Sequence, residues 1–524
     1  MRRYEVQKTL AIFALFFVAS SALMGQKEPA DRNGQAPSGL ALSDLANSAN
    51  QAAAIVDRAI RTSGGHARLD ELKSIGLDFE AEVAATFQGP NPKNPHRYLP
   101  RTGDLFFDVG RRQLITSSET RWPNFITTVK SLYRDDKTFT LDEQTKTFRE
   151  SNDAEVIEAW SLRLMPVVLK RLKDNPMSLA YADVVDVAGN KHDVVLSTLG
   201  TNRIYRVYFS RSSFMPEIVE NLDYSSDFGD MTVTRTFAGF REAGGFLIPT
   251  SVQMLQNGHR VFSYTLKNIS MDRPAKENAL DLPKDFQLAP AAVNPPKMNT
   301  HEIAKGVYLI ENLAGRDYNV MFADLGKSVV VFEAPIDMWA SKIALAEIRK
   351  VFPEKPIRFV MVSHFHDDHA AGIRNYMAEG IAVITTPGNR EHFEKIARLP
   401  HTFHGENNLL KATEPKFEIV RNKLHQIKGN DLTVQFLDLG PNAHVDENIV
   451  AYIPEREILF QGDFFRVPID RSKPERIRDE GLLLLQKIKE NGLAVKQLVG
   501  AHGPTGSVQD LERALEVRST TPSN

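Results

Sequence analysis

The segment His-Phe-His-Asp-Asp-His at positions 364–369 brings together several groups that bind metal ions. It holds three imidazoles and, at Asp368, a suitably spaced carboxylate. Neutral imidazole and carboxylate are ligands that Zn²⁺ prefers. Crowding them is costly unless a positive ion is bound among them. We therefore expect a metal site here rather than a solvated loop.

The flanking residues predict the elements that position this segment. The apolar run at 359–362 has the length of a buried strand, and Ile373, Tyr376 and Met377 recur at helical spacing. The segment thus lies at a strand-to-helix junction, which is where α/β layers place their sites.

Three later residues are further candidate ligands. His444 precedes an apolar run at 449–453, Asp463 ends the run that begins at Ile458, and His502 ends the run that begins at Leu498. Each therefore lies next to a predicted strand end, where it can join the histidine-rich segment.

The order of these motifs is similar to that of the metallo-β-lactamase superfamily. HxHxDH, a later His, a Gly-Asp at a strand end and a late Gly-x-His follow one another between about residues 300 and 520. The resemblance implies an αββα sandwich and two zinc ions per chain, with iron or manganese as alternatives. It implies that one zinc is held by His364, His366 and His444, that the second is held by Asp368, His369 and His502, and that Asp463 bridges the two.

The chemistry that the resemblance implies is hydrolysis by a hydroxide between the two metals. This hydroxide attacks an ester, lactone, thioester or amide, while Asp368 orients it and returns a proton to the leaving group. The family usually ends its first strand motif with Asp, whereas Glu333 stands here. Its longer carboxylate leaves the orientation of this supporting group open.

The residues near the motifs reduce the number of candidate substrate classes but do not identify the substrate. Asp463 argues against secreted β-lactamases that begin with HxHxDH, because their second site typically lacks a bridging carboxylate. Lactonases of the family usually carry a tyrosine shortly after this Asp, where Phe464 and Phe465 stand here. We expect a small-molecule substrate, with Arg466, His401 and His404 as candidate contacts. For the two histidines we favour the alternative that they are solvated loop residues.

Length and composition bound the remaining possibilities. A chain of 524 residues predicts two sizeable domains. A formal net charge of -2 gives no reason to expect a nucleic-acid partner. The chain has no cysteine, which excludes disulfides, thiolate metal ligands and cysteine nucleophiles. The composition does not indicate an oligomeric state.

The N-terminus has the pattern of a secretory signal peptide. Arg2, Arg3 and Lys8 precede an apolar stretch at 10–23, which is short for a membrane span. We expect a signal peptide at 1–25, a flexible segment at 26–50, and export to a periplasm or the cell exterior. An uncleaved anchor is the alternative.

Residues 51–288 predict a domain of mainly antiparallel strands, so that the whole chain is a two-domain α+β protein. Helical spacing marks 52–62, ending at Gly64-Gly65, and a second helix at about 154–173. Strands are predicted around 194–196, 205–209, 231–234 and 261–264. The pattern weakly resembles the half-barrel of lipoprotein carriers, which implies a lipid-like ligand; a structural or dimerising extension is the alternative. A proline-rich linker at 289–300 leads to a metal-binding domain at 301–520.

Two other functions use the same residues. One is a mononuclear iron oxidoreductase with the same ligand set. The other is a binding protein for an apolar ligand, in which the metal-binding domain is vestigial.

Overall fold

The computed structural model describes residues 42–122, 125–225, 229–275, 279–289, 297–402, 414–421, 425–467 and 477–520. The predicted signal peptide and most of the predicted linker lie outside these residues. Among the helices of the described ranges, none is long and apolar enough to cross a membrane.

The chain folds into two compact units, and the boundaries between them do not fall at the predicted linker. Among the described residues, unit 1 comprises 42–70 and 164–219, and unit 2 comprises those of 71–163 and 220–520. The strand β10 (Pro216–Ser225) contains one of the boundaries. Most strands of the predicted N-terminal domain thus belong to the same unit as the metal-binding domain.

Unit 1 packs helices on a small antiparallel sheet. Its helices are α2 (Leu42–Ser63), α3 (His66–Asp70) and α5 (Met165–Asp174), and its strands β7 (Ala180–Val187), β8 (Asn190–Ser197) and β9 (Tyr205–Ser210) pair in sequence order. Helix α2 ends before Gly64 as expected, but it begins within the segment predicted to be flexible. Leu45, Ser48 and Ala52 recur there at helical spacing, and Ser48 Oγ donates to Tyr181 O at 3.0 Å.

The first part of unit 2 is a long sheet that is antiparallel except for the parallel pair of β14 and β6, which confirms the prediction of a mainly antiparallel β-rich region. The strands lie in the order β14, β6, β5, β4, β3, β2, β1, β13, β12, β11. Their bounds are Gln287–Leu288 (β14), Thr147–Ser151 (β6), Lys137–Asp142 (β5), Ile126–Arg134 (β4), Gln113–Arg121 (β3), Arg97–Asp108 (β2), Ser74–Ala85 (β1), His259–Met271 (β13), Phe246–Gln256 (β12) and Gly229–Ala243 (β11).

The helix predicted at about 154–173 is two helices. Helix α4 (Glu155–Ser161) ends before Leu162, and α5 starts at Met165 with Pro166 in its first turn. Proline has no amide hydrogen to donate, so it fits the first turn of a helix and not its interior. Trp160 of α4 packs on Phe79 and Tyr264 of the sheet, with ring centroids 5.2 and 5.6 Å apart.

The second part of unit 2 has two further sheets. One has the order β15-β16-β17-β18-β19-β20-β21, with bounds Asn299–Ala304, Val307–Glu311, Val320–Asp324, Val329–Phe332, Ile357–Met361, Ala382–Thr385 and Phe417–Ile419. The other is β22-β23-β24-β25-β26, with bounds His425–Lys428, Thr433–Asp438, Ile449–Ile453, Ile458–Phe460 and Gln497–Val499. Helices α6 (Met338–Val351), α7 (Asp367–Ala370), α8 (Ile373–Ala378), α9 (Pro387–Arg398), α10 (Asp479–Glu490) and α11 (Val508–Thr520) connect or follow them.

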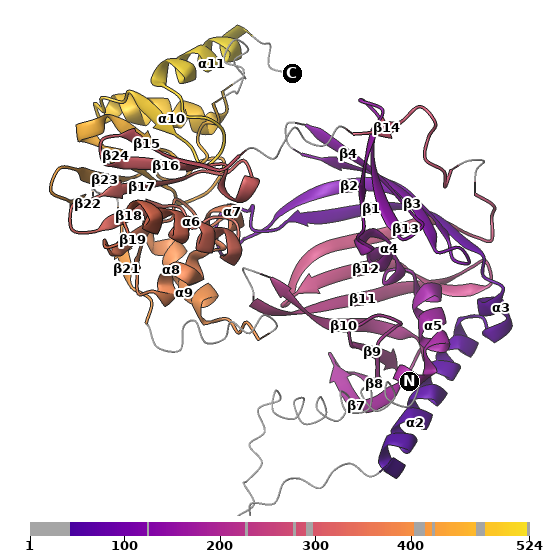
Figure 1. Ribbon diagram of the computed structural model, residues 1–524. Coiled ribbons are helices and arrows are strands. Elements are labelled where there is room, and N and C mark those ends of the chain that lie inside the picture. Colours follow the sequence, from indigo (N-terminus) through magenta and orange to yellow (C-terminus); the bar gives the residue numbers. More distant parts are fainter. Residues whose placement is uncertain are drawn as a thin grey trace, which may run out of the picture. The chain divides into compact units, whose positions relative to one another are not determined.

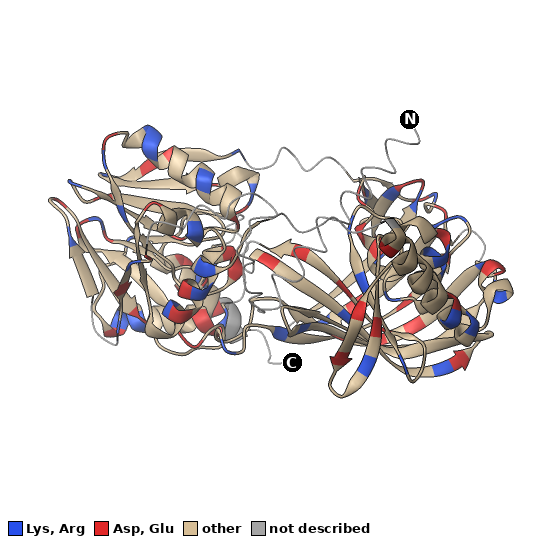
Figure 2. Ribbon diagram, turned by 90° about the horizontal axis from the view of Figure 1, so that it is seen from below, with Lys and Arg blue, Asp and Glu red and all other residues tan. Residues whose placement is uncertain are grey.

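These elements form the four layers of an αββα sandwich (Figure 1). Strand β18 shows why, because its four apolar residues are buried along both faces. Val329 and Val331 pack with the helices α6, α8 and α9, while Val330 and Phe332 pack with the second sheet. Helices α10 and α11 cover the other face of that second sheet. Lys and Arg are interspersed with Asp and Glu along the chain (Figure 2), in keeping with its small net charge.

Candidate metal centre

All seven predicted ligands lie in connections at the carboxyl ends of strands. The connection after β19 carries His364, His366, Asp368 and His369; that after β23 carries His444; and those after β25 and β26 carry Asp463 and His502. Because β19 and the other three strands belong to different sheets, the paired sheets of the sandwich bring the ligands together. The structure thus gathers every residue predicted from the motifs.

The first group consists of His364, His366 and His444, whose ligand atoms lie within 4.8 Å of one another. The Nε2 atoms of His364 and His444 are 3.2 Å apart. Burial lowers the pKa of His364 well below its usual value, and it lowers the pKa of His366 to about 3. These imidazoles are therefore neutral at neutral pH, and their lone pairs are available to a cation.

The second group consists of Asp368, His369, Asp463 and His502. His369 Nε2 lies 3.2 Å from Asp463 Oδ2 and 3.4 Å from Asp368 Oδ2. Burial by itself would lower the pKa of His369, but Asp463 and Asp368 outweigh it and raise that pKa well above its usual value. Burial opposes the charge of Asp368, yet His369 and His502 lower the pKa of this carboxyl to about 2. Protons on the imidazoles therefore neutralise the carboxylates here.

Three atoms in these groups show that the residues fit a metal ion. His366 Nδ1, His369 Nε2 and Asp463 Oδ1 are buried without a hydrogen-bond partner. Buried polar atoms nearly always have a partner, and a missing ion is one explanation for an exception. Imidazole nitrogen and carboxylate oxygen are the donor types of zinc sites. A metal bound by each group would satisfy all three atoms.

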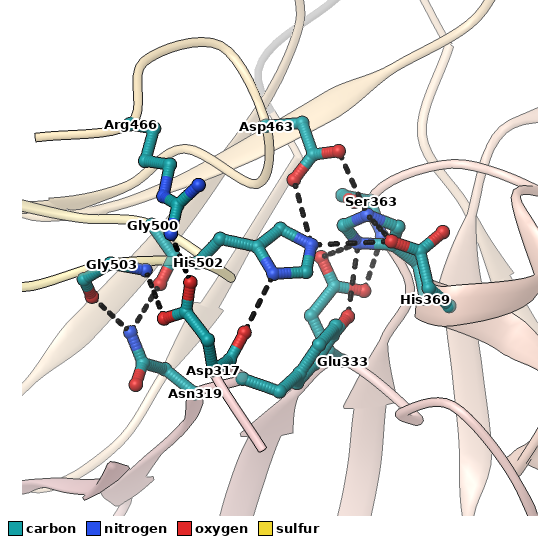
Figure 3. Close-up of polar contacts among 12 residues, drawn as sticks. Asp317, Asn319, Glu333, Ser363, His369, Asp463, Arg466, Gly500, His502 and Gly503 are labelled. Carbon is teal, nitrogen blue, oxygen red and sulfur yellow. Dashed lines mark hydrogen bonds and ion pairs between the residues drawn. The ribbon is translucent and has the colours of Figure 1, made fainter. Parts of the chain in front are cut away.

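The nitrogens that face away from the two groups are held by other parts of the domain. Ser363 Oγ lies 2.9 Å from His364 Nδ1, and His502 Nδ1 donates to Asp317 O at 2.8 Å. Figure 3 shows the His502 ring between Asp317 and Asp463. Such partners fix the tautomer and the ring orientation of metal ligands.

A glycine places Asp463 at the end of β25. Gly462 has φ +58°, a left-handed conformation that favours glycine. A Cβ at this position would lie 3.1 Å from Ser363 Oγ and 3.3 Å from Ser363 Cβ. The Gly-Asp pair recognised in the sequence is therefore a tight turn that brings the carboxylate beside the histidine-rich segment.

The family-model comparison matches the part of the chain that carries the seven predicted ligands. Residues 317–509 match the model of the metallo-beta-lactamase superfamily. They form a metallo-beta-lactamase superfamily domain. A curated relative, "Metallo-beta-lactamase IND-1" of Chryseobacterium indologenes, is 26% identical over 183 residues, which are 34% of this chain and 65% of the relative. The chain thus spans somewhat less than two thirds of that relative's length.

Solved structures of metallo-beta-lactamases align with 43% of this chain. A metallo-beta-lactamase from Pontibacter korlensis is 16% identical with a TM-score of 0.33, and 100% of its chain is covered. The metallo-beta-lactamase FIM-1 from Pseudomonas aeruginosa, in a mono-zinc form, is 20% identical with a TM-score of 0.32, and 97% of its chain is covered.

The candidate substrate contacts of the metallo-beta-lactamase domain have different surroundings. Arg466 is exposed and forms an ion pair with Asp317 (Figure 3). Because the backbone oxygen of Asp317 accepts from His502, Asp317 links Arg466 to a predicted ligand. His401 is fully buried, and its Nδ1 lies 3.0 Å from Tyr224 Oη. The expectation that His401 is a solvated residue is wrong, and burial leaves it no surface for contact with a substrate. His404 lies outside the described residues.

The sequence did not predict several residues that contact the ligands of the metal centre. Tyr318 Oη lies 3.2 Å from His369 Nδ1, and His366 Nε2 lies 2.9 Å from Gly89 O. Gln88 Nε2 donates to Asp368 Oδ1 at 3.3 Å. Gln88 and Gly89 lie far from the motifs in sequence, and no local pattern distinguishes them.

Proposed function

We propose that the protein is an exported dizinc hydrolase that cleaves an ester, lactone, thioester or amide bond. The observation that carries this proposal is the position of Asp463 between the two ligand groups. Its Oδ2 lies 3.7 Å from His444 Nε2 of the first group and 3.2 Å from His369 Nε2 of the second. A carboxylate that reaches both groups can hold two cations close to each other.

Each side chain has a defined part in this proposal. His364, His366 and His444 would hold one zinc, and Asp368, His369 and His502 would hold the other. Asp463, which belongs to the second group and also approaches His444, would contact both. Bound zinc would polarise the carbonyl oxygen of the substrate and lower the pKa of water. Asp368, ionised at neutral pH, can take a proton from the attacking water and pass it to the leaving group.

The family relative named a β-lactamase does not select the substrate. Asp463 stands where we expect secreted β-lactamases with the HxHxDH motif to lack a bridging carboxylate. A β-lactam is therefore one amide among the candidates. We keep the broader class of carbonyl substrates.

The full chain loaded with zinc tests the proposal. Metal content is measured first, and hydrolysis is then assayed with nitrocefin, lactones, thioesters and bis-p-nitrophenyl phosphate. We expect two zinc ions per chain and loss of activity in His366→Ala. His301→Ala is the matched control, since His301 is a partly exposed histidine on β15, outside both ligand groups. One iron per chain would instead support the oxidoreductase, and unchanged activity in His366→Ala would support the vestigial domain.

Export is proposed from the charged and apolar pattern of residues 1–25. Expression of the full chain in a Gram-negative host tests it. We expect a protein shortened by about the length of a signal peptide in the periplasm or medium, as measured by intact mass. A full-length protein retained in the membrane fraction would support the uncleaved anchor.

A lipid-like ligand of the N-terminal sheet remains a prediction. A pocket of about 270 Å³ in unit 1 is lined by Arg58, Asp193 and Arg211 among others. Its lining mixes these charged side chains with apolar ones such as Ile55 and Phe209. Fluorescent fatty-acid displacement checks the prediction directly.

A further inference from the structure

The connection between β1 and β2, residues 86–96, contacts the metal centre although it precedes the metallo-beta-lactamase domain by more than 200 residues. Gly89 O lies 2.9 Å from His366 Nε2. The side-chain amide of Gln88 donates to Asp367 Oδ1 at 3.1 Å and to Asp368 Oδ1 at 3.3 Å. Two predicted metal ligands thus contact this β1–β2 connection, and both contacts lie within unit 2.

The β1–β2 connection is held in place by its own contacts. Phe87 is 4% exposed and belongs to the same apolar core as Phe365 and Phe393. Further along, Asn91 Nδ2 donates to Asp446 Oδ2 at 2.6 Å, and Asp446 N donates to Pro90 O at 2.8 Å. The connection is therefore anchored on both sides of Gly89, which limits how far its carbonyl can move.

The contact with Gly89 selects the nitrogen of His366 that is free to bind a metal. A carbonyl oxygen only accepts, so His366 Nε2 carries the hydrogen and donates it to Gly89 O. The lone pair is then on Nδ1, which is buried without a partner. The ring is thereby fixed in the tautomer that presents Nδ1 to the first metal.

The contact with Gln88 selects the oxygen of Asp368 that is free to bind a metal. Its amide occupies Oδ1, while Oδ2 lies 3.2 Å from His502 Nε2 and 3.4 Å from His369 Nε2. Oδ2 is therefore the oxygen directed to the second group. A carboxylate without the Gln88 contact could rotate and exchange its two oxygens.

We propose that the β1–β2 connection is a positioning element of the metal centre, in which the Gly89 carbonyl orients His366 for the first metal and the Gln88 amide orients Asp368 for the second. The inference rests on the metal centre of the proposed function. It makes the segment before the metallo-beta-lactamase domain a part of the hydrolytic site and not only a recognition or spacing domain.

Substitution of Gly89 displaces its carbonyl in the full chain. A Cβ at Gly89 would lie 2.1 Å from Asn94 O and 2.7 Å from Pro95 C, so Gly89→Ala forces the connection to move. Gly110→Ala is the matched control, because a Cβ there meets nothing closer than 3.7 Å in the neighbouring β2–β3 turn. Gln88→Ala removes the amide and no backbone contact, with Gln113→Ala at the start of β3 as its control.

The readouts are zinc dissociation constants from chelator competition, the visible spectrum of the Co²⁺-loaded protein, and kcat and KM separately. We expect Gly89→Ala to weaken binding of the first metal and Gln88→Ala to weaken binding of the second, each by about 10–100-fold. Both variants should also show altered Co²⁺ absorption bands. The loss of activity should fall on kcat. Both controls should match the wild type.

Wild-type dissociation constants and Co²⁺ spectra in both variants would overturn the inference. If Gly89→Ala melts far below Gly110→Ala, the Gln88 variant alone decides the outcome. A wild-type protein that binds two metals but hydrolyses nothing overturns the proposed function only, since the dissociation constants of the variants still test the positioning element. A wild type that binds no divalent metal overturns both.

Discussion

Glu333 Oε1 lies 3.2 Å from His369 Nδ1, and neither side chain has exposed surface. Glu333 has φ +81°, a conformation that costs a non-glycine residue about 1–3 kcal/mol. Its Oε2 accepts from Ser363 N at 3.3 Å. The unusual backbone turns the carboxylate toward the metal centre. The longer side chain that stands in place of Asp therefore still reaches a predicted ligand.

Glu333→Gln should weaken binding of the second metal. The amide keeps the shape of the side chain but removes the charge opposite His369, and loss of such a partner reduces metal affinity about 10–100-fold. Chelator competition measures the change. Glu311→Gln is the control, because Glu311 pairs with His301 at 3.8 Å in a partly exposed position. Equal effects in the two variants would contradict a specific role for Glu333.

The second metal should bind more tightly as pH rises, whereas the first should not. His369 has a raised pKa in the metal-free protein, and a metal must displace its proton. His366, with a pKa of about 3, has no proton to lose at neutral pH. Calorimetric titration in buffers of different ionisation enthalpy counts the protons released. Equal proton release at both sites would contradict this expectation.

The raised pKa of His369 also predicts how the free energy of unfolding of the metal-free protein depends on pH. The folded-state pKa of His369 is raised above its unfolded value of about 6.5. Its stabilising contribution is therefore fully present below about pH 6.5 and is lost as pH rises through the raised pKa. Urea unfolding of the metal-free protein at several pH values measures this trend, and excess zinc should abolish it.

Asp463→Asn should leave one metal bound and lower kcat by at least about 100-fold. A neutral amide holds two cations poorly, and loss of about 3 kcal/mol of transition-state stabilisation corresponds to that factor. Metal analysis and steady-state kinetics check both parts. The control is Asp431→Asn, which changes an exposed carboxylate in the β22–β23 turn. Retention of two tightly bound metals would argue against a bridging role.

Arg466→Ala should raise KM with little change in metal content. Arg466 is 59% exposed, and its pair with Asp317 contributes about 0–1 kcal/mol. Asp317 holds His502 through its backbone oxygen, which the substitution leaves in place. Arg316→Ala removes a comparable exposed pair with Asp337. An Arg466 variant with unchanged KM for every cleaved substrate would remove Arg466 from the candidate contacts.

Local features were predictable from the sequence. The apolar run at 359–362 corresponds to β19 (Ile357–Met361), and the helical spacing at 373–377 corresponds to α8 (Ile373–Ala378). The break between α4 and α5 was missed, because the apolar spacing continues through it while Pro166 restarts the helix. The buried state of His401 was missed because its cover comes from Tyr224, far away in the sequence.

The histidine-rich segment at 364–369, His444, and the Gly-Asp and Gly-x-His motifs predict a set of seven metal ligands from the sequence alone. Ligand type and spacing at strand ends depend on residues that are close in sequence, so they can be recognised from the sequence. Only the tertiary structure showed that Glu333 reaches His369 and that Gln88 and Gly89 hold Asp368 and His366. These contacts depend on how separate parts of the chain pack, since hydrogen bonds act over about 3 Å and residues far apart in sequence meet only after folding.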